Sequence, residues 1–341
     1  MRPVSSSRRN FIRLSLGAGA VAATTSNWTA ISAFASDFED FIKGPPVPDI
    51  APQRLSEHVW MIYSEDGFPT PENKGMMCNV VFALTEQGVV MLDTGGSLQI
   101  GEMVIRQIRT LTDKPVVAAF NSHYHGDHWL ANHAFVEAYG EDLPIYAHPL
   151  TKREIEGIQG NLWRRLMEQW TNQATAGTRI VPPNRTVDHG VEFDFGDVRM
   201  RVHHYGVAHT PGDICIEIVG DDLTYVGDVA MDRRIANMDD GSYVGSLHFM
   251  DELERNAASS IWVPGHGHAG PDVLTWQREL FAGIYENCLV AVEEMKSMEE
   301  ARSMVLADPR VADKADETLG FESNIGKYIS LAYLEAERAA F

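Results

Sequence analysis

The sequence has 341 residues, of which 44% are hydrophobic and 22% are charged. This balance fits one large soluble domain with or without an appendage, and it excludes collagen-like, low-complexity and strongly disordered chains. The formal net charge of -20 argues against a nucleic-acid partner and against docking on anionic lipid, because both favour a basic surface.

The first 35 residues have the features of an export signal. Residues 8–9 are paired arginines and residues 11–12 are hydrophobic, which resembles a twin-arginine motif. A weakly apolar stretch follows and ends at residues 33–35 in Ala-Phe-Ala, an A-x-A cleavage pattern. We predict a twin-arginine signal peptide over residues 1–35 and a periplasmic location. No stable membrane insertion is expected after cleavage, because no other segment has 18 uninterrupted apolar residues.

Between residues 55 and 270, short β-like segments alternate with turns and a few helices. Segments rich in Val, Ile and Phe predict strands over residues 58–64, 77–84, 88–92, 115–120, 144–148, 187–204 (a hairpin), 215–219, 223–226 and 261–263. Apolar residues at helical spacing predict helices over residues 101–111 and 150–176. Strands with helices between them indicate two sheets covered by helices, an α+β architecture.

Beyond residue 271 the pattern becomes helical. Helices are predicted over residues 273–300 and 325–341, with a break at Asp308-Pro309. We expect a main domain over residues 36–270 and a C-terminal helical extension over residues 271–341.

The three cysteines are widely spaced and form no CxxC pair. An odd number at such spacing is not a disulfide framework. We expect no thiol chemistry, and we interpret Cys215, which lies in an apolar run, as a small hydrophobic residue.

Residues 121–128 read Asn-Ser-His-Tyr-His-Gly-Asp-His. His123 and His125 are two residues apart, so in an extended segment they point the same way and can share one metal ion. Asp127 and His128 follow a glycine that permits a sharp turn, and they can point toward a second ion. Imidazole and carboxylate ligands suit zinc, whereas packing these groups together without a metal would leave crowded, desolvated polar side chains. A solvent-exposed His-rich loop is disfavoured, because a predicted strand leads directly into the segment.

The pattern H-x-H-x-D-H resembles the signature of the metallo-β-lactamase superfamily, whose fold is an αβ/βα sandwich. Other segments between residues 55 and 270 are similar to the remaining motifs of this superfamily, in the same order. They place Asp93 in the turn at residues 92–96, His209 in residues 208–213, Asp228 at the end of residues 225–228, and His266 in residues 263–267. Ala208 stands where glycine is usual in the family.

The resemblance implies two metal ions held by seven side chains. One ion would be bound by His123, His125 and His209, the other by Asp127, His128 and His266, and Asp228 would bridge the two. Zinc is the expected metal, and the mixed ligand set would also accept iron or manganese. Each ion would keep an open position for water, as a catalytic site requires.

Two such ions can hold a bridging hydroxide at neutral pH. We therefore expect a metal-dependent hydrolase whose metal-bound hydroxide attacks a thioester or ester-type carbonyl. Asp127 is expected to be the catalytic residue that orients the hydroxide as well as a ligand. The aspartate at position 228 favours the glyoxalase II-like branch over true zinc β-lactamases, which usually carry cysteine or serine there. The chain also resembles exported zinc hydrolases associated with sulfur oxidation or quinoproteins.

Two alternatives stay open: a β-lactam or lactone hydrolase, and a non-catalytic metal-retaining binding protein of a redox system. The expected partner is a small-molecule substrate. Arg233 and Arg234 are interpreted as a solvated loop pair, with contact to an anionic substrate as the alternative. The loop at residues 65–76 is a candidate flap over the site. His133, His148, His203 and His204 are predicted to be packing or surface residues, and His268 is a weak candidate for supporting a ligand.

Overall fold

The structure is a computed structural model, and it describes residues 42–65, 67–235 and 238–340. The predicted signal peptide over residues 1–35 lies outside the described residues, as does the start of the predicted main domain at residue 36. Contacts within the chain group Lys43–Phe341 into one unit.

Seven strands form the first sheet, in the order β1-β2-β3-β4-β5-β6-β7. They are β1 (Gln53–Arg54), β2 (Val59–Ile62), β3 (Val80–Leu84), β4 (Val89–Leu92), β5 (Val116–Phe120), β6 (Ile145–Ala147) and β7 (Arg185–Thr186). Pairing is antiparallel from β1 to β4 and parallel from β4 to β7.

Five strands form the second sheet, in the order β12-β11-β10-β9-β8. They are β8 (Glu192–Asp194), β9 (Arg199–His203), β10 (Cys215–Val219), β11 (Leu223–Gly227) and β12 (Ile261–Pro264). Only β11 and β12 pair in parallel in this sheet. Both sheets are therefore mixed, as the predicted sandwich requires.

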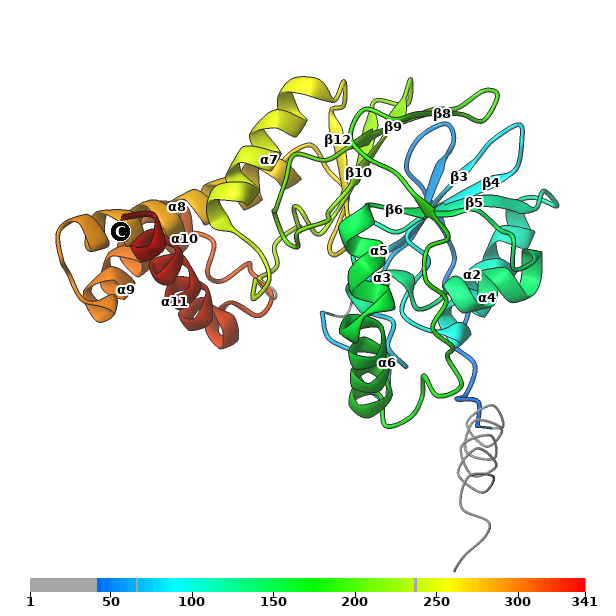
Figure 1. The fold of residues 1–341 in the computed structure, drawn as a ribbon, viewed down its shortest axis with the longest axis horizontal. Helices are drawn as coiled ribbons and strands as arrows, with labels where there is room; N and C mark the ends of the chain where they lie inside the picture. The colour runs from blue at the N-terminus through cyan, green and yellow to red at the C-terminus, as the bar shows by residue number, and fades with distance from the viewer. Residues whose placement is uncertain (1–41, 66, 236–237, 341) are drawn as a thin grey trace, which may run out of the picture. The chain divides into compact units, whose positions relative to one another are not determined.

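Helices lie between the strands and follow the last one. They are α2 (Leu98–Leu111), α3 (Gly126–Trp129), α4 (Asn132–Tyr139), α5 (Pro149–Glu156), α6 (Ile158–Trp170), α7 (Tyr243–Asn256), α8 (Val273–Glu293), α9 (Met298–Ala307), α10 (Pro309–Ala312) and α11 (Phe321–Ala340). In Figure 1, α2 and α4 lie beside the first sheet, and α7 lies beside the second.

The alternation of side chains along the strands produces the layers. In β4, Val89 and Met91 pack against α2 and α4, whereas Val90 and Leu92 point into the core between the two sheets. Because successive side chains point to opposite faces and both faces are covered, the whole strand is apolar. A separate core under the second sheet includes residues of α7, α8 and α11. The order helix, sheet, sheet, helix confirms the predicted α+β class and αβ/βα sandwich, with helices at the C-terminus.

Caps explain where the helix bounds differ from those predicted. Helix α2 begins at Leu98, before the predicted residue 101, because the Ser97 side chain accepts a hydrogen bond from the Ile100 amide. The predicted helix over residues 150–176 is two helices that meet at Gly157. The predicted helix over residues 273–300 is also divided, because Ser297 and Glu300 form a capping box that begins α9.

Helix α7 was not predicted, although its sequence carries a signal. Ser242 caps its first turn by accepting a hydrogen bond from the Gly245 amide. Its buried residues recur at helical spacing from Tyr243 through Phe249 to Leu253. This helix covers the second sheet, opposite the face that meets the first sheet.

The C-terminal extension also pairs with the loop after β11. Arg234 and Leu319 form an isolated parallel bridge. The Ile235 amide donates to the Leu319 carbonyl at 3.1 Å, and the Leu319 amide donates to the Arg233 carbonyl at 2.9 Å. The short turn before α11 is thereby fixed beside the segment that follows Asp228.

Among the described residues, no helix combines the length and the apolar character that a membrane crossing needs.

Candidate metal centre

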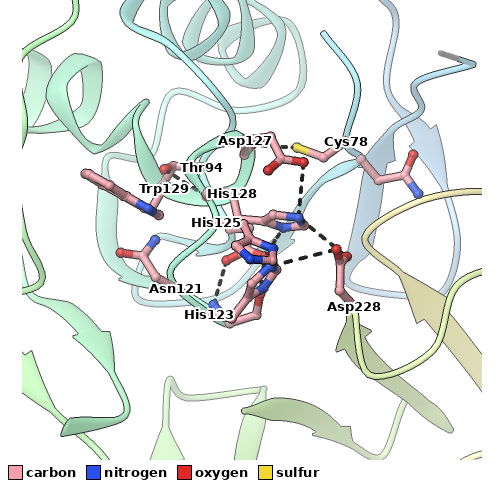
Figure 2. A network of polar contacts seen from close by, with 12 residues as sticks. Cys78, Thr94, Asn121, His123, His125, Asp127, His128, Trp129 and Asp228 are labelled. Atoms are coloured by element: carbon pink, nitrogen blue, oxygen red, sulfur yellow. Dashed lines mark hydrogen bonds and ion pairs between the residues drawn. The ribbon is translucent and has the colours of Figure 1, made fainter. Parts of the chain in front are cut away.

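The seven predicted ligands meet where strands of both sheets end. His123 and His125 follow β5, and Asp127 and His128 lie in the short helix α3. His209 lies between β9 and β10, Asp228 comes directly after β11, and His266 follows β12. All seven are buried, and Figure 2 shows several of them directed toward one another.

Their ligating atoms form two groups. His123, His125, His209 and Asp228 make up one group, and Asp127, His128 and His266 make up the other. Within each group the candidate ligating atoms all lie within 4.8 Å of one another. The division of the histidines is the one that the sequence predicted.

Asp228 faces both groups. Its Oδ2 atom lies 3.5 Å from His209 Nε2 and 3.4 Å from His266 Nε2, and its Oδ1 atom lies 3.4 Å from His128 Nε2. Oδ2 therefore lies between the imidazoles of the two groups, which is the arrangement of a bridging ligand. The place of Asp228 directly after β11 is where the resemblance implies a bridging carboxylate.

The spacing of the ligating atoms fits small divalent ions. Four atoms at about 2.1 Å from a tetrahedral ion lie about 3.4 Å from one another. Asp127 Oδ2 lies 3.4 Å from His128 Nε2 and 3.3 Å from His266 Nε2. His209 Nε2 and His125 Nδ1 are closer, at 2.9 Å. The second group therefore has the dimensions of a coordination sphere, and the first is slightly contracted.

Three ligating atoms lack hydrogen-bond partners among the described residues. They are His123 Nε2, His128 Nε2 and Asp228 Oδ1, and all three are buried. A buried polar atom without a partner is costly and calls for an explanation. Metal ions at the two groups would satisfy all three atoms, so the donor set fits the cofactor that the fold family implies.

The other ring nitrogen of several histidines is bound by the protein. His266 Nδ1 lies 2.7 Å from the Met77 carbonyl, and His128 Nδ1 lies 2.8 Å from Asp93 Oδ2. His123 Nδ1 lies 3.0 Å from Ser122 Oγ. Such bonds fix the tautomer and the orientation of a ligating imidazole.

Two glycines are required because neighbouring atoms approach closely. A Cβ at Gly126 would lie 2.7 Å from Trp163 Cβ, so α3 can pack against α6 only without a side chain there. A Cβ at Gly265 would lie 2.3 Å from Asp228 Oδ1 and 2.7 Å from His128 Cε1. The sequence suggested that Gly126 permits a sharp turn, and the structure shows that it permits close packing.

Electrostatics prepare the first group for a metal. Burial lowers the pKa of His123, lowers that of His125 to about 4, and lowers that of His209 to about 3. These imidazoles are therefore neutral near pH 7, which is the form that binds metal ions.

In Asp127 and Asp228, the effect of neighbouring histidines on the pKa outweighs the effect of burial. Burial opposes the ionisation of Asp127 and Asp228, but His128 and His266 hold the pKa of both carboxyl groups well below the usual range. Burial likewise opposes the protonation of His128. The nearby carboxylates have the larger effect and raise the pKa of His128. A divalent ion beside these carboxylates would supply positive charge in place of that proton.

The two groups open onto a pocket of about 990 Å³. His125, Asp127, His209, Asp228 and His266 lie at its wall. Residues 67–70 of the predicted flap also line it, as do the α6 side chains of Trp163 and Trp170 and residues of α11 such as Lys327. A molecule in this pocket would contact both candidate metal groups.

The four histidines that were predicted to be packing or surface residues have partners outside the ligand groups. His133 Nε2 lies 2.9 Å from Glu137, and His203 Nε2 lies 2.9 Å from Glu217. His148 stacks on His204 with ring centroids 4.0 Å apart. His268 stacks on Tyr63 and belongs to neither ligand group.

Arg233 and Arg234 differ from each other, contrary to their interpretation as a solvated pair. The Arg233 side chain is 38% exposed and lies 2.7 Å from Asp272. Arg234 is only 9% exposed and lines the pocket. The sequence could not show this difference, because Arg234 is covered by residues distant in the chain.

Two residues that support the ligands were not predicted from the sequence. Tyr225 Oη donates to Asp93 Oδ2 at 2.6 Å. Cys78 Sγ donates to the Asp127 carbonyl at 2.7 Å (Figure 2), and burial raises the pKa of its thiol. All three cysteines are free and buried, which agrees with the prediction of a chain without a disulfide framework.

Comparison with known proteins agrees with this geometry. The profile of a family described as "Metallo-beta-lactamase superfamily" matches residues 73–304, which is more than half of the chain. No curated protein matches the sequence.

Three solved structures illustrate the similarity of the fold. A metallo-beta-lactamase from Pontibacter korlensis is 19% identical, with a TM-score of 0.53 over 68% of this chain and 99% of that chain. DIM-1 metallo-beta-lactamase is 16% identical, with a TM-score of 0.50 over 69% of this chain and 98% of its own. VMB-1 is 17% identical, with a TM-score of 0.50 over 68% of this chain and 96% of its own. At these identities the likeness concerns the fold.

Proposed function

Because the chain belongs to the metallo-beta-lactamase superfamily, we propose that it is an exported hydrolase that uses two divalent ions, with zinc as the preferred metal. Its substrate is a small molecule with a thioester or ester-type carbonyl. The observation that carries the proposal is the pair of buried ligand groups, with Asp228 facing both of them. Residues 123, 125 and 209 would hold one ion, residues 127, 128 and 266 would hold the other, and Asp228 would contact both.

The metal ions supply Lewis acidity and a water nucleophile that ionises near neutral pH. The protein fixes the ligands. Hydrogen bonds from the Nδ1 atoms of His128 and His266 direct their Nε2 atoms toward Asp127 and Asp228. These groups need no rearrangement when a substrate binds, because they are held by the ends of strands and by a short helix.

Asp127 is the proposed catalytic residue. It lines the pocket and is only 3% exposed. Burial opposes its ionisation, but His128 keeps the pKa of its carboxyl group low, so the carboxylate is ionised and can accept a hydrogen bond from a water molecule. A carboxylate in this place can orient the nucleophile toward a carbonyl that is held in the pocket.

The aspartate at position 228 supports the glyoxalase II-like branch. A carboxylate can bridge two ions by giving one oxygen to each, whereas a cysteine offers one sulfur atom. The predicted twin-arginine signal supports export, and the resemblance to exported zinc hydrolases supports an association with sulfur-oxidation or quinoprotein systems. The solved structures named as metallo-beta-lactamases make a β-lactam the second substrate class to test.

The test begins with the number of metal ions per purified chain. The same sample is then assayed on a panel of thioesters and on a chromogenic β-lactam. Asp228→Ser is assayed in parallel, with Asp313→Ser, an exposed position after α10, as the matched control. We expect two ions and thioester turnover in the wild type and the control, and loss of both in Asp228→Ser.

Three outcomes would contradict parts of the proposal. Preferential β-lactam turnover that survives in Asp228→Ser would place the protein with the lactamases. Two bound ions without turnover of any ester, thioester or lactam would favour a metal-retaining binding protein. Fewer than two ions in the active wild type would exclude the dinuclear mechanism.

Export is tested separately. Replacing the two arginines at positions 8 and 9 with lysines is expected to retain the full-length protein inside the cell, because the twin-arginine route requires that pair. Cell fractionation and N-terminal sequencing of the periplasmic form provide the measurement. Secretion of the lysine variant at the normal level would reject this route.

A further inference from the structure

Arg234 is a buried cation beside the candidate metal centre. It is 9% exposed and lines the same pocket as Asp127 and Asp228. One of its terminal nitrogens, Nη2, donates to the Gly67 carbonyl. The other, Nη1, is buried and has no hydrogen-bond partner among the residues that the structure describes.

Such a guanidinium calls for an anion. Arginine is always charged and offers five N–H donors in a planar fork that matches a carboxylate. Burial of a charge without a partner is costly. Burial lowers the pKa of Arg234, while the charges of Asp228 and Asp127 raise it. Those two carboxylates are assigned to the metal ions, and Arg234 forms no ion pair with any of the described residues.

Arg234 is held through its neighbours' backbone groups and through its own side chain. The adjacent Arg233 carbonyl and Ile235 amide are both bonded to Leu319, in the turn before α11. The side chain is held by Gly67 in the loop at residues 67–70. The guanidinium is therefore a fixed part of the pocket and is not a mobile surface group.

Another part of the pocket wall is apolar and aromatic. On α6, Leu162, Trp163, Leu166 and Trp170 recur at helical spacing and line the pocket. The ring of Phe68 lies 5.0 Å from that of Trp170. Leu162 is 43% exposed, so this face of α6 is not covered by the rest of the protein. We call these five side chains the α6 wall.

We propose that Arg234 is a specificity-determining residue, and that the substrate is a hydrophobic carboxylate. Its carboxylate would bind Arg234, its apolar body would lie on the α6 wall, and its scissile carbonyl would lie at the ligand groups. This inference rests on the proposed function, whose substrate class it narrows. Arg234 takes no part in bond breaking in this scheme.

Binding of non-hydrolysable probes tests the inference without any turnover. The probes are 2-naphthylacetate and its neutral amide, 2-naphthylacetamide, with the metal-loaded full chain. Their binding is measured by calorimetry and by quenching of tryptophan fluorescence, since Trp163 and Trp170 line the pocket. We expect the carboxylate to bind the wild type at least about 10-fold more tightly than the amide.

Three variants test whether Arg234 contacts the carboxylate of the probe. Arg234→Gln is expected to weaken carboxylate binding about 10- to 100-fold and to leave amide binding unchanged. Arg233→Gln is the matched control, because it makes the same charge change one residue away in a half-exposed side chain, and it is expected to change neither probe. Trp170→Ala is expected to weaken both probes to a similar extent. Metal content is measured in every variant.

Each contrary result overturns the inference. Unchanged carboxylate binding in Arg234→Gln would mean that the metal ions alone bind the anion. Equal loss of both probes would mean that Arg234 only maintains the pocket. If Arg234→Gln does not fold, Arg234→Lys replaces it, and reduced discrimination between the probes with intact metal content is the expected result, because lysine lacks the planar fork. Undiminished discrimination in that lysine variant would reject the contact, whereas turnover of neutral thioesters would still support the proposed function.

Discussion

The Asp93 carboxylate lies 2.8 Å from Nδ1 of His128, and both side chains are fully buried. Asp93 also accepts hydrogen bonds from the Ser122 amide, the Ser122 hydroxyl and the Tyr225 hydroxyl, at 2.6–2.7 Å. The carboxylate is therefore held from several sides. Its bond to Nδ1 assigns the proton of His128 to that nitrogen, which leaves Nε2 free for a metal ion.

Asp93→Asn is expected to weaken binding of the metal ion at His128 by about 10- to 100-fold, as for other residues that orient a ligating histidine. Asn also tolerates the left-handed backbone that Asp93 adopts, with φ of 62°, so the variant is expected to fold. A competition titration with a chelator measures the affinity. Tyr225→Phe, which removes one donor to Asp93, is expected to have a smaller effect. Unaltered affinity in Asp93→Asn would show that His128 needs no such support.

Gly265→Ala is expected to displace the Asp228 carboxylate, because the new Cβ would lie 2.3 Å from Oδ1. We predict reduced metal content and loss of turnover. Gly326→Ala is the matched control, since a Cβ there meets nothing within 4 Å and alanine is favoured within helix α11. Elemental analysis and thermal unfolding compare the two variants. Full metal content in Gly265→Ala would show that the bridging position can relax.

Removal of the metal ions with a chelator is expected to lower the melting temperature. An ion that binds only the folded state stabilises it by about 4 kcal/mol when its free concentration is about 1,000 times the dissociation constant. Differential scanning calorimetry with and without chelator measures the shift, and added zinc should reverse it. Asp228→Ser is expected to show a smaller shift than the wild type. An equal shift in that variant would mean that the stabilising ion binds elsewhere.

The stability of the protein is expected to fall as the pH is lowered from about 6.5 to about 4, in part because of His148. Burial, and then the charge of the stacked His204, lower its pKa to about 4, whereas the unfolded chain titrates near 6.5. Between these values the unfolded state binds more protons, so acid favours unfolding. Below about pH 4 this group contributes no further loss.

His148→Asn tests this contribution while keeping a cap on α5. The His148 ring accepts a hydrogen bond from the Leu150 amide, and asparagine is a favourable N-cap residue. The free energy of unfolding, measured by urea titration from pH 4 to pH 7, is expected to depend less on pH in this variant. His248→Asn makes the same change at an exposed position of α7. An equal pH dependence in wild type and His148→Asn would exclude His148 as a cause.

The sequence predicted those parts of the site that depend on local order. His123, His125, Asp127 and His128 are neighbours in the chain, and the strand before them is marked by its apolar residues. The sandwich followed from strands with helices between them and from the resemblance. Ligand positions at 209, 228 and 266 came from that resemblance, because their nearness to residue 123 depends on how the two sheets pack.

Other features depend on contacts between distant segments. The burial of Arg234 requires Gly67 and Leu319, which lie far from it in the sequence. Helix α7 has the cap and spacing of a helix, but its only moderate apolar content does not distinguish it from a loop. The boundary predicted at residue 270 stays a prediction, and the family match extends beyond it to residue 304.

Each ligand group contains residues that follow strands of both sheets. In the second group, Asp127 and His128 follow a strand of the first sheet, and His266 follows a strand of the second. An ion bound there would act as a cross-link between the two sheets. Separation of the layers would then require the release of the ion, so the bound metal would govern the rate of unfolding as well as the equilibrium. The lifetime of the folded protein under proteolysis would accordingly follow the metal supply.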